Sequence, residues 1–337
     1  MQIIKKILLL GASGQIGKEL SIHLQKNNSI RLTCIVRNKV SAAFFKRNNI
    51  NFLVAELGDS LMKKIINESD LIFELSAPLT GSLYETKKFY KERIDIIANN
   101  IRTDCKFVFA SSMNALGYSL NYPVLKNYFF PRTLYAANKR FAEKYICKLS
   151  KKYKFKYYNI RLTEVHGYFQ KASENIKKLI LLENTFIIPK TPAYVTFIST
   201  INEMLINILN EKELPGTYYL LTKENIYWND LLNYLGKKVN KEVKFIFKEE
   251  KSNLKIFRYF FQQILLKYKD VFLAIIPFSK NFLEELKLNF RVNKVKKYIK
   301  YEKEKKQYTG LSRLVGTISG PRVNSIKETN EEIFKKN

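Results

Sequence analysis

The chain has 337 residues, a hydrophobic content of 46% and a formal net charge of +29. This length allows two lobes, and this hydrophobic content is typical of a globular protein rather than a disordered one. Three separated cysteines (Cys34, Cys105 and Cys147) and two histidines (His23 and His166) argue against a disulfide framework and against a metal site, and they fit a reducing compartment.

The positive charge is spread along the chain, and no nucleic-acid-binding motif accompanies it, so we expect no nucleic-acid partner. Residues 251–306 are an exception, because they combine many lysines with Phe and Tyr, a composition that suits weak contact with a membrane surface. Charges interrupt the apolar run at 256–278, so it is too polar to span a membrane. The apolar residues 1–10 run directly into a glycine turn and are typical of a first strand rather than a signal peptide. We therefore expect a cytoplasmic protein.

Apolar strands alternate with amphipathic helices through the first half of the chain. This alternation predicts an α/β fold, a Rossmann-like doubly wound parallel sheet with a smaller C-terminal substrate lobe. The predicted strands are residues 3–10, 31–36, 51–54, 71–75, 106–110 and 156–162, and the predicted helices include 17–26, 60–67 and 135–150.

The pattern loosens after about residue 165. Helices are predicted at 173–183, 201–210 and 228–237, and strands at 194–198 and 217–221. We expect a dinucleotide-binding domain over residues 1–165, a substrate lobe over 166–305 that is interleaved with the last sheet strands, and a C-terminal tail over 306–337.

A glycine motif follows the first predicted strand. Gly11, Gly14 and Gly17 have the spacing G-x-x-G-x-x-G, and a helical pattern begins behind them. Such glycines permit a tight turn, a close approach of the backbone to phosphate, and close packing of the helix on the strand. The alternative is a glycine-rich turn without a ligand. The cofactor-binding residues that we expect here are Gly11, Ser13, Gly14, Gln15, Ile16 and Gly17.

Two further motifs supply catalytic chemistry. Tyr135 and Lys139 are four residues apart on a predicted helix, so the phenol and the ammonium lie on one face. The pKa of a free tyrosine is about 10, and a nearby cation lowers it. Tyr135 could therefore exchange protons with a substrate oxygen. The strand at 106–110 leads into Ser111 and Ser112, at the sheet edge where ligands bind in doubly wound folds. We expect Ser112 to donate to the same oxygen; the alternative is a turn or helix cap.

Together these segments resemble the extended short-chain dehydrogenase/reductase group, the NAD-dependent epimerase/dehydratase family that acts on nucleotide sugars. The matching segments are GASGQIG, FVFASSMNALG, PRTLYAANKRFAE, NIRLTEVHG and GTYYLLTKENIYWNDLLNYL. The resemblance implies that Ser112, Tyr135 and Lys139 form the catalytic triad and that Lys139 also holds the nicotinamide ribose. It further implies a nucleotide-sugar substrate and a homodimer.

One departure from the family narrows the chemistry. Its dehydratases have an Asp-Glu pair after the strand-end hydroxyl, whereas Met113 and Asn114 stand here. Neither residue can act as an acid or base, which argues against a 4,6-dehydratase.

The second strand ends at Arg37. An arginine at this place accommodates the 2′-phosphate of NADP, whereas NAD sites usually have an acidic residue. We therefore expect NADP, with NAD as the alternative, and the backbone of Ser76 and Ala77 lining it. The leading hypothesis is a 4-keto-sugar reductase. The alternatives are a nucleotide-sugar 4-epimerase with retained NAD and a non-catalytic dinucleotide-binding member.

Overall fold

The computed structural model describes residues 4–78, 82–116, 134–183, 185–190, 193–222 and 226–248. Several features of the sequence analysis lie outside these residues. They are Gly117 at the end of the segment FVFASSMNALG, Pro131 at the start of PRTLYAANKRFAE, the basic aromatic segment 251–306 and the tail at 306–337.

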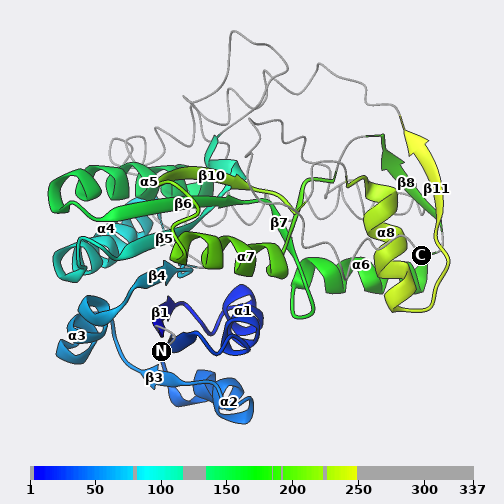
Figure 1. The fold of residues 1–337 in the computed structure, drawn as a ribbon. Coiled ribbons are helices and arrows are strands. Elements are labelled where there is room, and N and C mark those ends of the chain that lie inside the picture. Colours follow the sequence, from blue (N-terminus) through cyan, green and yellow to red (C-terminus); the bar gives the residue numbers. More distant parts are fainter. Residues whose placement is uncertain are drawn as a thin grey trace, which may run out of the picture.

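A seven-stranded sheet forms the centre of the molecule (Figure 1). Its strand order is β10-β6-β5-β4-β1-β2-β3, and every neighbouring pair is parallel. The strands are β1 (Lys5–Leu10), β2 (Ile30–Val36), β3 (Phe52–Val54), β4 (Leu71–Glu74), β5 (Lys106–Ser112), β6 (Lys156–Leu162) and β10 (Gly216–Leu220). The strands predicted in the first half of the chain and at 217–221 lie in this sheet, whereas the strand predicted at 194–198 lies in a separate two-stranded sheet.

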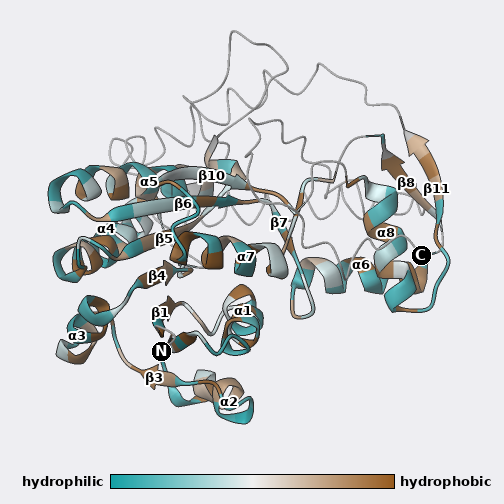
Figure 2. Ribbon diagram, in the orientation of Figure 1, coloured by the Kyte–Doolittle hydropathy of each residue, from teal (hydrophilic) through white to brown (hydrophobic). Residues whose placement is uncertain are grey.

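Helices cover both faces of the sheet, so the predicted Rossmann-like, doubly wound fold is confirmed. One face is covered by α1 (Gln15–Gln25), α2 (Lys39–Arg47) and α7 (Ile198–Leu209). The other is covered by α3 (Ser60–Glu68), α4 (Leu83–Asn100) and α5 (Leu134–Tyr153). These helices carry both hydrophobic and hydrophilic residues (Figure 2), as expected for helices with one face on a core.

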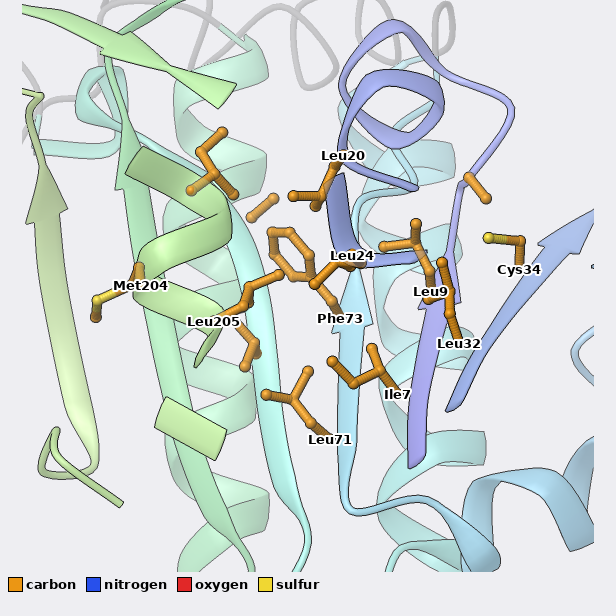
Figure 3. Packing of buried hydrophobic residues seen from close by; sticks show 14 of the residues in the cluster. Ile7, Leu9, Leu20, Leu24, Leu32, Cys34, Leu71, Phe73, Met204 and Leu205 are labelled. Carbon is orange, nitrogen blue, oxygen red and sulfur yellow. The ribbon is translucent and has the colours of Figure 1, made fainter. Parts of the chain in front are cut away.

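The strands are apolar on both faces because both are covered. In β1, Ile7 and Leu9 pack into the core under α1 and α7, and Leu8 and Leu10 pack into the core under α3 and α4. Figure 3 shows the first of these cores, in which Leu20 and Leu24 of α1 lie close to Phe73 of β4. This packing fixes the carboxyl ends of β1, β4 and β5 at one edge of the sheet.

A smaller unit with its own core follows the sixth strand. It contains β7 (Glu164–His166), α6 (Lys171–Leu182), β8 (Thr185–Pro189), β9 (Val195–Phe197), α8 (Trp228–Lys238) and β11 (Lys244–Lys248). β7 pairs with β9, and β8 pairs with β11. The chain returns to the central sheet at α7 and β10 between these elements, as Figure 1 shows.

Within the described part of the chain, no helix is both long and apolar enough to cross a lipid bilayer.

Candidate active site

The tight turn after β1 is built by glycines that leave no room for a side chain. Gly11 has a φ of 72°, a left-handed conformation that favours glycine. A Cβ on Gly11 would lie 2.7 Å from the amide nitrogen of Ser76, so the end of β1 closely approaches the end of β4. The predicted cofactor-lining residue Ser76 is therefore in contact with the glycine turn.

The other two glycines shape the start of α1. Gly14 is the N-cap of α1 and provides no side-chain cap, and its own N–H donates to the Gly11 carbonyl at 3.1 Å. Gly17 packs against the backbone of Ala12 so closely that a Cβ there would lie 2.5 Å from the Ala12 carbonyl oxygen. The first turn of the helix thus has N–H groups that no N-cap side chain accepts from, which is the arrangement that binds a phosphate.

The other predicted cofactor residues surround this turn with different exposure. Ser13 and Ile16 are half-buried, and Gln15 and Ala77 are exposed. The side-chain oxygen of Gln15 accepts from the Lys171 N–H at 3.3 Å, so this residue also joins α1 to the second unit.

Arg37 is exposed at the end of β2, directly before α2. The next residue, Asn38, caps α2 by accepting from the Ser41 N–H at 2.8 Å. Arg37 makes no hydrogen bond or ion pair with another described residue, so its guanidinium remains available to an anion.

Ser112 and Tyr135 are brought together as the sequence predicted. Ser112 is the last residue of β5 and is buried, and its hydroxyl is hydrogen-bonded to the Tyr135 phenol. The Ser112 Oγ also accepts from the Asn114 N–H at 3.2 Å. Tyr135 is 46% exposed, which leaves its side chain accessible to a ligand.

Lys139 lies beneath this pair in a nearly apolar setting. Its Nζ donates to the Ala110 carbonyl at 2.6 Å, and the residue as a whole is 2% exposed. The ring centroids of Phe109, Tyr90 and Tyr135 lie 4.6, 5.3 and 5.8 Å from this nitrogen. The ammonium is therefore stabilised by a carbonyl and by ring faces.

The electrostatics of the pair differ in one respect from the expectation. Burial raises the pKa of Tyr135 above its ordinary value, and the hydrogen bond from Ser112 acts in the opposite direction. The sequence analysis predicted that Lys139 lowers this pKa, whereas in the structure burial has the largest effect and the opposing effect comes from Ser112. Burial also lowers the pKa of Lys139 to about 8, while the carboxylates of Glu74 and Glu143 act in the opposite direction and raise it.

A buried network that the sequence analysis did not assign lies behind Ser112. The Ser111 Oγ donates to Glu143 at 2.5 Å, and Arg161 donates to both Glu143 carboxylate oxygens at 2.8 and 2.6 Å. Arg161 also donates to the Tyr219 hydroxyl at 2.6 Å. Glu143 follows Tyr135 and Lys139 at the same spacing of four, which was a usable signal, whereas Arg161 and Tyr219 are joined to it only by the fold.

A second buried carboxylate was also missed. Glu74 ends β4 with 1% exposure, accepts from the Ser76 N–H at 2.6 Å and forms an ion pair with Arg93 of α4 at 2.7 Å. A single acidic residue at the end of an apolar strand was the only sequence signal for this residue.

Glu19 joins the glycine turn to the second unit. Its carboxylate, on α1, accepts from the N–H groups of Tyr168 and Phe169 at 2.6 and 2.9 Å and from the Gln170 side chain at 2.8 Å. Because these residues lie directly before α6, α1 and the second unit share one buried contact.

Met113 and Asn114 lie in a short 3-10 helix after Ser112 and bring no carboxylate to the site. Within the described residues, no group of three or more His, Cys, Asp or Glu side chains is arranged to hold a metal ion.

Comparison with known proteins identifies the family. Residues 7–184, more than half of the chain, match the model of the NAD dependent epimerase/dehydratase family. Comparison with curated proteins gives no match.

Solved structures share the fold at low sequence identity. A UDP-N-acetylglucosamine 4-epimerase from Methanobrevibacter ruminantium M1 is 19% identical, with a TM-score of 0.55. The match covers 74% of this chain and 87% of the epimerase chain. A UDP-glucuronic acid 4-epimerase from Bacillus cereus, in complex with UDP-glucuronic acid and NAD, is 19% identical, covers 73% and 86%, and has a TM-score of 0.56. With the glycine turn and the parallel sheet, the family match leads to one conclusion: the chain belongs to the NAD dependent epimerase/dehydratase family.

Proposed function

We propose that the chain is a nucleotide-sugar 4-epimerase that works with a retained nicotinamide dinucleotide. One observation carries this proposal: the Ser112 hydroxyl is hydrogen-bonded to the phenol of Tyr135, and the buried ammonium of Lys139 lies next to that phenol. These are the groups needed to move a proton to and from a sugar hydroxyl.

The bare glycine turn fits the pyrophosphate of such a cofactor. Side chains on Gly11 or Gly17 would fill the space against Ser76 and Ala12, and Gly14 leaves the start of α1 uncapped. Ser13, Gln15 and Ile16 would supply further backbone contacts, with Ser76 and Ala77 lining the dinucleotide.

Each residue of the triad has one task. A nicotinamide dinucleotide held at the glycine turn would supply the hydride chemistry, namely reversible removal of the hydride from the sugar C4 and its return to the opposite face. Tyr135, as phenolate, takes the proton of the 4-hydroxyl and later gives it back. Ser112 donates a hydrogen bond to the same oxygen, and Lys139 stabilises the phenolate by its charge. Lys139 must therefore be protonated at the stage when Tyr135 is deprotonated.

The epimerase is favoured over the reductase of the sequence analysis by its structural relatives. The solved structures described above are 4-epimerases of UDP-linked sugars. A UDP-sugar is accordingly the substrate to test first. The family's chemistry is common to both activities, so the sequence motifs alone could not separate them.

A 4-keto-sugar reductase that uses NADP is the second candidate. Its support is Arg37, which is exposed at the end of β2 and makes no hydrogen bond or ion pair with another described residue. Its guanidinium would pair with a 2′-phosphate, as arginines at this place do. NADP and a homodimeric, cytoplasmic enzyme remain predictions for this chain.

The two candidates differ in what they consume. We expect the purified protein to interconvert UDP-N-acetylglucosamine or UDP-glucuronic acid with its C4 epimer, followed by NMR, without net loss of a cofactor. Oxidation of one NADPH for each UDP-4-keto-sugar converted, without epimerisation, would support the reductase. Absence of both reactions would contradict both candidates, and a dinucleotide still retained in native mass spectrometry would then favour the non-catalytic dinucleotide-binding alternative.

A further inference from the structure

The buried carboxylate of Glu74 is not explained by the fold alone. Ionised side chains are costly to bury unless they are paired and hydrogen-bonded. Glu74 is 1% exposed at the end of an apolar strand whose other residues are Leu71, Ile72 and Phe73. A hydrophobic residue would continue that pattern, so the carboxylate calls for a reason.

The partners of Glu74 fix its position. One carboxylate oxygen accepts from the Ser76 N–H at 2.6 Å, and the other accepts from Nε and Nη2 of Arg93 at 2.9 and 2.7 Å. Arg93 also donates to the Ser76 Oγ at 3.1 Å. These bonds fix the carboxylate in place and connect β4, α4 and the segment that contacts Gly11.

Glu74 faces the same side of the sheet as Lys139. It is paired in register with Phe109 of β5, and neighbouring residues of parallel strands point to one face. Phe109 packs in the core under α4 and α5, and its ring lies 4.6 Å from Lys139 Nζ. The carboxylate and the ammonium therefore share the space between the sheet and these helices.

The ammonium of Lys139 needs such a carboxylate. Among the described residues no carboxylate oxygen lies within 4.0 Å of its nitrogen, which is bonded only to the Ala110 carbonyl. From α5 it is faced by Tyr135 and from α4 by Tyr90, and the charged groups that act on it are the carboxylates of Glu74 and Glu143. Water is nearly excluded, so its charge depends on the field of charged neighbours.

Two ion pairs with buried carboxylates belong to the elements around Lys139. Glu143 is paired with Arg161 at 2.6 Å and Glu74 with Arg93 at 2.7 Å. Lys139 forms no ion pair of its own with a described residue, so it depends on the field of these carboxylates. Both carboxylates oppose the effect of burial on Lys139, Glu74 being the stronger of the two.

We propose that Glu74 is a positioning residue for catalysis: held by Arg93 and Ser76, its carboxylate keeps the buried Lys139 ammonium charged beneath Tyr135. The inference rests on the proposed function in one respect, that Lys139 acts on Tyr135. Glu74 acts on the phenol through Lys139.

The test measures the protonation of Lys139 directly, without any turnover. The full-length protein is labelled with [13Cε]lysine and titrated by NMR, and the Lys139 signal is identified by its absence from Lys139→Met. We expect a midpoint near pH 8 in the wild type. In Glu74→Gln we expect it to move down by about one pH unit, because an opposing charge is lost. In Arg93→Gln we expect it to move up, because Glu74 loses the cation that neutralises it.

Opposite shifts from two partners of one ion pair distinguish charge from structural damage, which would move both midpoints in the same direction. Glu74→Asp keeps the charge and should keep the midpoint. Glu92→Gln is the matched control, because Glu92 is exposed on α4 and pairs only with Lys88 at 3.8 Å. It should leave the midpoint unchanged.

A Lys139 midpoint that stays fixed in both Glu74→Gln and Arg93→Gln would overturn the inference, while the activity tests above would leave the proposed function standing. If Glu74→Gln does not fold, Glu74→Asp and Arg93→Gln decide the question. Conversely, opposite shifts in a protein without epimerase or reductase activity would support the electrostatic coupling and contradict the proposed function.

Discussion

The two ends of the candidate site are built in different ways. The turn after β1 is formed by backbone, and its important property is the absence of side chains at Gly11 and Gly17. The other end, at β5 and α5, is formed by buried charge around Lys139. The comparison teaches that shape governs binding at the first end and that charge governs proton transfer at the second, so substitutions at the two ends should have separable effects.

The largest effect is expected from Tyr135→Phe, which removes the proton-transferring group and little else. We expect kcat to fall by about a thousandfold, within the range for loss of a general acid–base group. The amount of dinucleotide in native mass spectrometry should stay unchanged, because the glycine turn is intact. Full activity in this variant would show that the charged end does not carry out the reaction.

Glu143→Gln tests the charge balance through stability. The substitution leaves the Arg161 guanidinium, whose side chain is 12% exposed, without its carboxylate. Breaking a buried pair costs about 3 kcal/mol or more, and urea unfolding would measure that loss. An unchanged midpoint and slope would mean that the network is replaceable by neutral hydrogen bonds.

Gly17→Ala should break the first end without touching the second. The new Cβ would lie 2.5 Å from the Ala12 carbonyl oxygen and 2.6 Å from its Cα, so the helix must move away from β1. We expect a loss of about 1–3 kcal/mol of stability, as for other overpacked sites, and loss of retained dinucleotide. Gly58→Ala is the matched control, because nothing lies within 4 Å of its Cβ position.

Arg37→Ala gives the smallest effect and sharpens the comparison, since it asks whether the glycine end also uses charge. If NADP is bound there, its affinity should fall about tenfold relative to NAD, the effect of one charge-assisted hydrogen bond. Isothermal titration with each cofactor would measure this ratio. An unchanged ratio would contradict the role of Arg37 and favour NAD.

The glycine turn, the Tyr135–Lys139 spacing and the succession of strands and helices could be predicted from the sequence because each depends on local patterns. Buried strands read as apolar runs, and Tyr135 and Lys139 share a helix face through their spacing of four. The strand predicted at 106–110 continues to Ser112 in the structure. Ser111 can be buried there because its hydroxyl donates a hydrogen bond to Glu143.

The ion pairs could not be predicted in the same way. Arg93 lies 19 residues from Glu74 and Arg161 lies 18 residues from Glu143, and only the docking of α4 and β6 brings them together. Likewise, β7, β8 and β11 are short strands that pair with partners far along the chain, so they left no clear local pattern.

The central claim is that Ser112, Tyr135 and Lys139 epimerise C4 of a nucleotide sugar. The most direct measurement follows a UDP-sugar deuterated at C4 through the reaction with unlabelled cofactor. Our account predicts that the C4 epimer forms and keeps its deuterium, because the hydrogen removed from C4 is returned to C4 without exchange with solvent. Loss of deuterium to solvent, or a reaction in which hydrogen from added NADPH appears at C4, would contradict it.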